Sequence, residues 1–369
     1  MTKTIGTVFK VINIVVVLLY LSACLIPFLP AGKFWMIAIL GLIFPLLAAL
    51  VIVCFFIWLA FRSKWSYLSL IAILLSWQQL SVIVGINSSN KFNYSKTNKT
   101  LRVLSWNVSS WGETNKSQTN PANYGPLTLE LIRHQKADIL CLQEFWDKKA
   151  PHSSYSVIEA FKEMGYLYSY FVKSHLENKN QKMGVAIISK YPIVDSSKLY
   201  FGKDDFAEHL ISVDIQFHNQ RIRILTTHLQ SVRFDNSEYT ALRKIKQKDE
   251  TGLKDSRTIV HKLKTAYSYR GAEADLVQQK IKESTYPVII CGDFNDVPNS
   301  YTYFTIKHNL QDAFLKKGTG LGRTFQYLSP TLRIDYIFAD KKFKVEQYSR
   351  LKVPYSDHYP IIADLNPIP

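Results

Sequence analysis

The sequence predicts an α+β domain joined to a membrane anchor, and three observations support this fold class. The first hundred residues contain three apolar stretches that are each long enough to cross a bilayer. A polar segment follows at residues 87–100. From residue 101 onward, short apolar strands alternate with helical stretches, and some neighbouring strands are only a few residues apart. Hairpins mixed with helices favour a layered α+β domain over a doubly wound parallel sheet.

The three apolar stretches cover residues 11–29, 34–61 and 65–86. A helix needs roughly 20 apolar residues to cross a bilayer, and Trp or Tyr near the ends of such stretches is typical of membrane interfaces. A signal peptide followed by buried core helices is the alternative interpretation. It fits poorly, because the first stretch lacks a clear small-residue cleavage site and two further stretches follow at once. We therefore expect residues 1–86 to form an anchor of three transmembrane helices.

The basic residues of the anchor predict on which side of the membrane the rest of the chain lies. The first hundred residues contain eight Lys or Arg and no Asp or Glu. Four of these lie before the first stretch or after the second: Lys3, Lys10, Arg62 and Lys64. Lys33 alone lies between the first two stretches. The positive-inside rule then predicts a cytoplasmic N-terminus and, after three spans, an extracytoplasmic domain. Three lysines after the third stretch oppose this assignment: Lys91, Lys96 and Lys99.

The region from residue 101 to the C-terminus has the pattern of short strands mixed with helices. The expected strands cover residues 101–106, 139–143, 185–189, 211–217, 222–227, 288–291, 334–338 and 361–365. Helices are expected at residues 128–134 and 155–164. Because so few residues separate 211–217 from 222–227, these two strands are expected to form a hairpin.

Residues 231–284 interrupt this pattern with a long and strongly charged stretch. We interpret it as a helical insertion, with helices at 241–248, 260–264 and 272–282. Its first part, residues 231–270, contains ten basic and five acidic residues, including the cluster Arg243, Lys244, Lys246 and Lys248. A solvated helical face and a surface for anionic lipid both fit this charge pattern.

Polar side chains follow the ends of the expected strands, where a rigid sheet can present them to a shared cleft. These residues are Asn107, Glu144, His228, Asp293, Asn295, Asp335, Asp357 and His358. Phosphoester hydrolysis needs this combination of side chains. Carboxylate and amide oxygens bind Mg²⁺, a carboxylate can orient water, and His and Asn can donate hydrogen bonds to phosphoryl oxygens.

Other chemistries fit the sequence less well. The four cysteines form no C-x-x-C pair, so neither a zinc ribbon nor a redox motif is indicated. The sequence has no G-x-S-x-G motif of a serine hydrolase and no Walker loop. The polar residues at the strand ends therefore remain the main indication of function.

Six motifs, in sequence order, resemble those of the endonuclease/exonuclease/phosphatase superfamily, which has the deoxyribonuclease-I-like fold. They are Ser105-Trp106-Asn107, Leu142-Gln143-Glu144, Thr227-His228-Leu229, Gly292-Asp293-Phe294-Asn295, Ile334-Asp335-Tyr336 and Ser356-Asp357-His358. The resemblance covers roughly residues 101–366 and is closest to bacterial members attached to the inner membrane. It implies a four-layer α/β/β/α sandwich, with the active site at one edge of two packed sheets.

The resemblance also implies a metal site. Glu144 is expected to be the main ligand of Mg²⁺, with Mn²⁺ as the alternative ion. Asn107 is expected to lie close to both the metal and the phosphate. Asp357 is expected either to bind the metal or to support its neighbour in the chain.

The remaining site residues have implied catalytic roles. Asp293 is expected to orient or deprotonate the attacking water, and Asn295 to hold the water or a phosphoryl oxygen. His228 and His358 are expected to donate hydrogen bonds to the phosphate. Asp335 is expected to pair with His358 and to fix the orientation of its ring.

The expected activity is that of a membrane-anchored, Mg²⁺-dependent phosphodiesterase or phosphatase. Ser109 stands where DNA-repair members often have an amide or a carboxylate, which argues against a repair nuclease. A linker of about fourteen residues has a mean reach of roughly 20 Å, which favours a phosphoester substrate near the membrane, such as a lipid headgroup. Two alternatives stay open: a membrane-tethered nuclease that acts on nucleic acid, and a catalytically inactive binding module.

Overall fold

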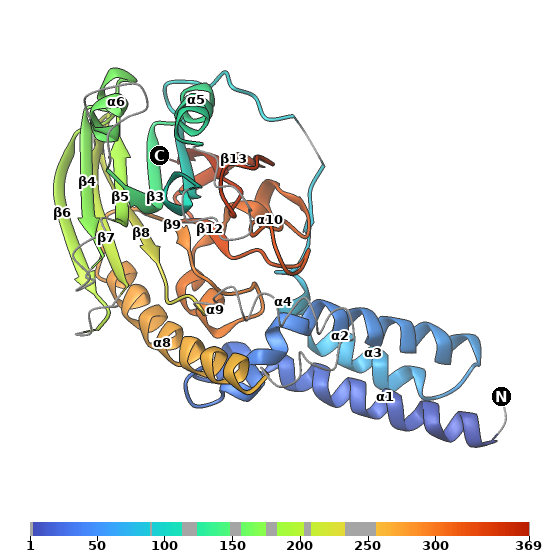
Figure 1. The fold of residues 1–369 in the computed structure, drawn as a ribbon. Helices are drawn as coiled ribbons and strands as arrows, with labels where there is room; N and C mark the ends of the chain where they lie inside the picture. Colours follow the sequence, from blue (N-terminus) through green and yellow to red (C-terminus); the bar gives the residue numbers. More distant parts are fainter. Residues whose placement is uncertain are drawn as a thin grey trace.

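The computed structural model describes residues 3–88, 91–112, 124–147, 156–174, 183–202, 208–232 and 256–368. These residues form a sandwich of two β-sheets with helices on its outer faces, and a bundle of apolar helices projects from one end (Figure 1). The structure thus confirms the α+β sandwich that the sequence predicts.

The first sheet has six strands in the order β13-β14-β2-β3-β5-β4. Their bounds are β2 Leu101–Asn107, β3 Ile139–Trp146, β4 Tyr168–Lys173, β5 Met183–Ser189, β13 Phe343–Arg350 and β14 Ile361–Pro367. Helices α5 (Gly125–Gln135) and α6 (Val157–Glu163) pack on its outer face through a cluster that includes Trp106, Ile132 and Phe161.

The second sheet also has six strands, in the order β10-β12-β9-β8-β7-β6. Their bounds are β6 Ile193–Tyr200, β7 His209–Phe217, β8 Gln220–His228, β9 Val288–Asp293, β10 Gln311–Asp312 and β12 Asp335–Ala339. Helices α8 (Ser256–Lys282) and α9 (Tyr301–Lys307) cover its outer face, and the short α10 (Ala313–Lys317) packs beside β12 and β13.

Strand alternation explains how the sandwich is filled. In β9, Ile289 and Cys291 face the other sheet, whereas Val288 and Ile290 face the helices on the outside. Because successive side chains of a strand point to opposite faces, a continuous apolar run suits a sheet that is covered on both sides. The core between the sheets is therefore built by every second residue of each central strand.

Some expected elements differ from the observed ones. The expected helices at 260–264 and 272–282 belong to one continuous helix, α8. Gly271 lies within α8, where the lack of a side chain lets the helix approach Ala31 closely. The expected helix at 241–248 lies outside the described residues. Strands β4, β6 and β13 were not expected, because each is only partly buried and lacks a long apolar run.

The N-terminal bundle consists of α1 (Lys3–Cys24), α2 (Trp35–Ala60), α3 (Ser66–Leu75) and α4 (Trp77–Leu80). The chain begins at the end of the bundle farthest from the sandwich, and α1 leads toward the sandwich (Figure 1). Helix α2 runs away from it again, and α3 and α4 lead back. Among the described residues, two helices are long and apolar enough to cross a membrane: 4–28 and 35–60.

The expectation of a third long transmembrane helix is wrong. Helix α3 has ten residues and spans only about 15 Å, and α4 adds a single turn. The helix is interrupted at Ser76, whose hydroxyl donates to the Ile73 carbonyl oxygen and hydrogen-bonds to Tyr20. Such local bonds between side chain and backbone compete with a regular helix.

The bundle and the sandwich share one hydrophobic core. Phe44 of α2 belongs to the same buried cluster as Ile290 and Phe338 of the second sheet. The Asn299 amide donates to the Ala23 carbonyl oxygen at 3.0 Å, and the Arg333 guanidinium donates to the Val82 carbonyl oxygen at 2.6 Å. These contacts hold the bundle directly against the sandwich.

The polar segment after the bundle is also held against the sandwich. Strand β1 (Gly85–Ile86) pairs with β11 (Thr319–Gly320), and the Asn87 amide donates to two carbonyl oxygens near α10. Farther along, the buried Arg102 guanidinium donates to the carbonyl oxygens of Asn93 and Tyr94. The described residues of this segment are therefore held in place by the sandwich. The mean reach of a flexible linker does not apply to them.

Candidate active site

Strand pairing brings the predicted site residues to one edge of the sandwich. Strands β2 and β3 are parallel neighbours, so Asn107 and Glu144 leave the first sheet side by side. In the second sheet, β8 and β9 are also parallel, and His228 pairs with Asp293. Strand β12 runs antiparallel to β9, so its first residue, Asp335, also lies opposite Asp293.

The Asp293 carboxylate lies at the centre of this group. Its Oδ2 accepts a hydrogen bond from the Asn107 amide at 3.1 Å and lies 3.6 Å from His228 Nε2 and 3.5 Å from His358 Nε2. Its Oδ1 accepts a hydrogen bond from the Asn295 backbone N–H at 2.9 Å. The side chain is buried, and burial together with Asp335 raises the pKa of the carboxyl group above its usual range.

Gly292 permits this close arrangement. A Cβ at this position would lie 2.1 Å from the Thr227 carbonyl oxygen of the neighbouring strand, and the backbone φ is +149°. Any side chain here would push β8 and β9 apart. The glycine of the motif therefore keeps His228 and Asp293 in register.

An irregularity in β3 presents Glu144 at the edge of the sandwich. The pairing of β3 with β5 shifts register between Leu142 and Phe145, and Glu144 itself has a φ of +47°. Bulges of this kind re-aim side chains next to active sites. The Glu144 side chain is 30% exposed, and its Oε1 accepts a hydrogen bond from Asn107 at 3.1 Å. Burial and the nearby Asp357 raise the pKa of Glu144, against the opposing effect of His228.

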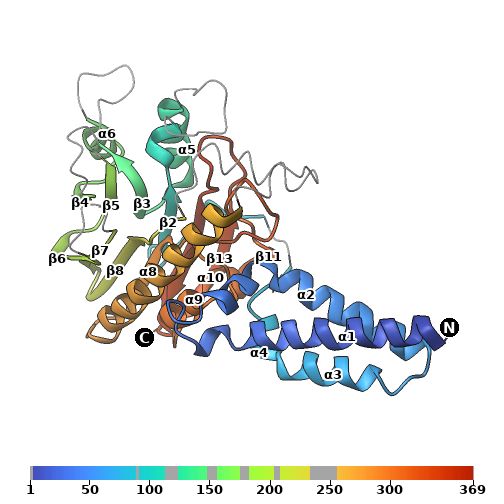
Figure 2. The same ribbon diagram turned by 60° about the horizontal axis from the view of Figure 1, so that its bottom comes forward.

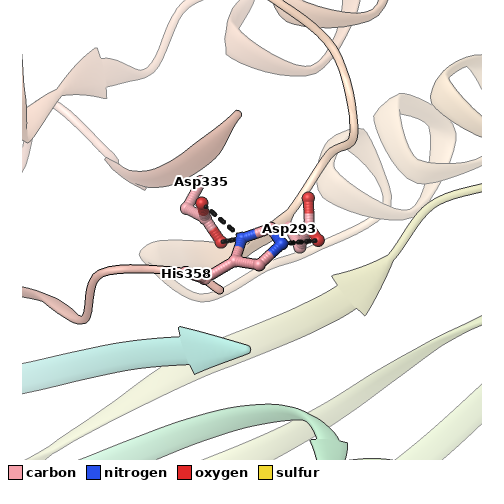
Figure 3. A group of neighbouring side chains, drawn as sticks. All are labelled: Asp293, Asp335 and His358. Carbon is pink, nitrogen blue, oxygen red and sulfur yellow. Dashed lines mark hydrogen bonds and ion pairs between the residues drawn. The ribbon is translucent and has the colours of Figure 1, made fainter. Parts of the chain in front are cut away.

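His358 and Asp335 form a buried pair beside Asp293. The ring Nδ1 lies 2.9 Å from Asp335 Oδ2, and Nε2 faces Asp293 (Figure 3). Burial alone lowers the pKa of the imidazole, but Asp335 and Asp293 outweigh it and raise that pKa well above its ordinary value. The ring is also fixed through its backbone, because Trp106 donates to the His358 carbonyl oxygen.

His228 has a carboxylate partner that sequence reasoning missed. Its Nδ1 lies 3.3 Å from Oε2 of the buried Glu208. Burial lowers the pKa of His228, but Glu208, Asp293 and Glu144 raise it to about 10. Glu208 belongs to none of the motifs, and its one sequence signal is that it directly precedes strand β7.

Two further predicted residues lie at the margin of the site. The Asn295 amide donates to the Leu229 carbonyl oxygen at 2.9 Å, which links the loops after β8 and β9. Asp357 is half-buried, accepts a hydrogen bond from the Ser356 hydroxyl, and lies near enough to Glu144 to raise its pKa. The fold thus brings together all eight residues that the sequence indicated.

Comparison with protein families decides the identity of this domain. The sequence profile of the endonuclease/exonuclease/phosphatase family matches residues 104–358, which is more than half of the chain. The chain belongs to this family. A second profile, a domain of unknown function (DUF8431), matches residues 6–83, which make up most of the bundle. A search of curated proteins found no significant match.

Solved structures of the family have the same fold. A family member from Bacteroides vulgatus is 18% identical with a TM-score of 0.51, and the match covers 74% of this chain and 100% of that one. A member from Beutenbergia cavernae is 17% identical with a TM-score of 0.50, covering 73% and 72%. The human Nocturnin catalytic domain with bound sulfate is 19% identical with a TM-score of 0.50, covering 72% and 93%.

Members of this family are phosphoester hydrolases that generally use divalent metals, and the donor set here fits such an ion. Two carboxylates of the site, Glu144 and Asp293, have raised pKa values because they are buried, and repulsion from the neighbouring Asp357 and Asp335, respectively, adds to the effect. A divalent cation removes this repulsion. Carboxylate and amide oxygens are also the ligands that suit Mg²⁺.

Two groups of residues are candidates for holding the ion. Ligand atoms of Asp293, Asp335 and His358 lie within 4.8 Å of one another. All three are buried, however, and the Asp335 carboxylate is engaged by the His358 ring. Glu144 is exposed enough to share an ion with a substrate, and Asn107 and Asp357 lie beside it. Glu144, Asn107 and Asp357 are therefore the better candidates.

Proposed function

We propose that this protein is a membrane-anchored phosphoester hydrolase that depends on Mg²⁺, with Mn²⁺ as the alternative ion. The observation that carries this proposal is the position of the Asp293 carboxylate. It lies within 3.6 Å of side-chain nitrogens of Asn107, His228 and His358, and the partly exposed Glu144 side chain lies beside them. A water held by Asp293 would therefore lie close to a phosphate bound at the Glu144 side.

Each residue then has a chemical role. Glu144, with Asn107 and Asp357, would hold the ion, which neutralises charge on the phosphoryl oxygens. Asp293 orients the attacking water and accepts its proton. His228 and His358, both held in their charged forms by carboxylates, donate hydrogen bonds to the phosphoryl oxygens.

Two residues support this arrangement without touching the substrate. Asp335 holds the His358 ring through Nδ1, so that Nε2 faces the site. Asn295 ties the loop after β9 to the loop after β8 and donates its backbone N–H to Asp293. Asn295 therefore positions the carboxylate that orients the water.

The experiment that tests the activity is a substrate panel on the full-length protein with Mg²⁺, Mn²⁺ or EDTA. Glu144→Gln and Asp293→Asn should each reduce the rate by at least about 10²-fold, because each removes a charge that acts in the transition state. Lys282→Gln, an exposed change at the far end of α8, serves as the folded control. Undiminished turnover by both site variants, or no turnover of any substrate, would support the inactive binding module instead.

Membrane anchoring is supported by the surface of the bundle. The side chains of Leu18, Leu46 and Phe56 are each about 60% exposed. Only 33% and 39% of the most apolar stretch of the first and second long helix, respectively, is buried. A helix that is apolar on its exposed faces suits lipid rather than water. A cleaved signal sequence is the alternative, but α1 shares the hydrophobic core of the sandwich.

The path of the bundle and its charges support a proposal for the side of the membrane on which the sandwich lies. The chain starts at the far end of the bundle, close to the loop that carries Arg62 and Lys64 (Figure 1). The positive-inside rule assigns that end to the cytoplasm. The short helices α3 and α4 lead from there back to the sandwich, so we propose that this interrupted pair makes the third crossing and that the sandwich is extracytoplasmic. Reporter fusions at the C-terminus test this: alkaline phosphatase should be active there, and activity of only a cytoplasmic reporter would reverse the assignment.

For the substrate, we favour a phosphoester at the membrane, such as a lipid headgroup. The loop after β9 contacts the bundle directly, because Asn299 bonds to Ala23 and lies against Gly41 of α2. The site is therefore only a few residues from the membrane-facing helices. A nuclease is the second candidate. Rapid nicking of plasmid DNA without turnover of anionic-lipid vesicles, under identical Mg²⁺ and salt, would favour the nuclease.

A further inference from the structure

The N-terminal half of α8 carries an uneven distribution of charge. Residues 256–272 contain basic side chains and no Asp or Glu, whereas the remainder of the helix contains Glu273 and Asp275. Arg257 and Lys264 are exposed, and Lys262 lies on the same segment. The apolar side chain of Val260 is also exposed, at 42%. The segment is therefore basic and partly apolar on its outer surface.

This half of α8 lies beside the start of α2. Tyr267 packs in a small buried cluster with Ala31 and Ala38, and Ser268 lies against Gly32. The middle of α8 lies next to the beginning of α2 in both views of the fold (Figure 2). The close packing fixes the depth of the helix relative to the bundle.

The membrane anchoring proposed above would place that depth near the membrane interface. Trp35 is the first residue of α2, and Trp is typical of the level of the lipid headgroups. The Lys264 ammonium lies over the Trp35 ring at 5.7 Å, so this cation of α8 is at the same level. Lys33 is exposed in the adjoining loop, and the neighbouring apolar side chains of Phe28 and Met36 are 65% and 68% exposed.

We propose that residues 257–264 of α8, together with Lys33, form a contact surface for the headgroups of anionic phospholipids. The surface is continuous with the helices that span the bilayer, and it therefore rests on the membrane anchoring proposed above. Charge complementarity favours an anionic leaflet, because each cation near such a surface favours contact by about fivefold. Val260 lies among these cations and is placed to enter the headgroup layer.

The test measures contact with lipid and requires no substrate. The full-length Val260→Cys variant is labelled with an environment-sensitive fluorophore, since the four native cysteines are buried. It is reconstituted in nanodiscs of phosphatidylcholine, or of phosphatidylcholine with phosphatidylglycerol, that contain a headgroup quencher. We expect at least twofold stronger quenching with phosphatidylglycerol, and we expect high salt to remove the difference because it screens surface charge.

Matched variants make the test specific. Arg257→Glu combined with Lys264→Glu should abolish the effect of phosphatidylglycerol. Lys280→Glu combined with Lys282→Glu, at the opposite end of the same helix, should leave it intact. Equal quenching in both lipids, or quenching that is insensitive to the first pair of changes, would overturn the proposal.

A second label separates this proposal from the anchoring on which it rests. Leu46 of α2 is 59% exposed, and Leu46→Cys should be quenched by acyl-chain quenchers if the bundle is embedded. Quenching at position 46 without an anionic-lipid effect at position 260 would refute the α8 surface alone. Lack of quenching at position 46 would refute the anchoring and the surface together.

Discussion

His228 is held between two carboxylates, with Nδ1 3.3 Å from Glu208 Oε2 and Nε2 3.6 Å from Asp293 Oδ2. The ring therefore keeps its proton, and its pKa rises to about 10 even though burial opposes the charge. A permanently charged imidazole is a suitable donor for an anionic phosphoryl group. Glu208 acts on the site through His228.

Replacing Glu208 should make the activity depend on pH. In Glu208→Gln the pKa of His228 falls, so the charged ring is lost at a lower pH than in the wild type. We expect a loss of about tenfold at pH 8.5 and a smaller loss at pH 6.5. Initial rates across pH 6 to 9 test this, with Glu159→Gln on the outer helix α6 as the control. The same loss at every pH would mean that Glu208 is required only for packing.

The His358–Asp335 pair predicts a similar dependence. Asp335 raises the pKa of His358, so Asp335→Asn should leave the ring neutral near pH 8 and still charged at mildly acidic pH. We expect kcat to fall by about 10²-fold at pH 8 and by less at pH 6. His358→Gln, which has no charge at either pH, should show no recovery at pH 6. Recovery in that variant would contradict the explanation.

A buried histidine outside the site predicts a loss of stability in acid. Burial lowers the pKa of His209 to about 4, while Nε2 bonds to the Val172 carbonyl oxygen. A depressed folded-state pKa contributes stability above the unfolded value of about 6.5, and this is lost as pH falls toward 4. Between pH 7 and pH 5 we expect a loss of about 2 kcal/mol.

The measurement is the thermal unfolding midpoint in detergent at pH 7 and pH 5. His209→Gln keeps a donor for Val172 but does not titrate, so its midpoint should fall less between the two pH values. An identical fall in both proteins would show that other groups cause the acid sensitivity.

The junction between bundle and sandwich predicts an effect of Gly41 on both stability and catalysis. A Cβ at Gly41 would lie 2.6 Å from the Asn299 carbonyl oxygen, which is a backbone atom. Gly41→Ala should therefore cost about 1–3 kcal/mol through overpacking and displace the loop that follows Asn295. Leu46→Ala, at an exposed position of the same helix, is the control. The unfolding midpoint and kcat should both fall in Gly41→Ala and not in the control.

The sequence by itself determined the fold class of the sandwich and indicated the candidate site residues. Short apolar strands, hairpins and helices predicted an α+β domain, and the family resemblance implied that its strands form two packed sheets. The motif residues were recognisable since each follows or opens a strand, and strand ends of one sheet edge converge. Asn107, Glu144, His228 and Asp293 meet for that reason.

Only the tertiary structure decided the partners of those residues and the nature of the anchor. Glu208 and His228 are far apart in sequence, and their pairing depends on the register of β7 with β8. The third apolar stretch had the composition of a span, but its helix is interrupted where Ser76 bonds to its own backbone and to Tyr20. Composition records how apolar a segment is, whereas its helix length and its contacts depend on which side chains meet it in the folded chain.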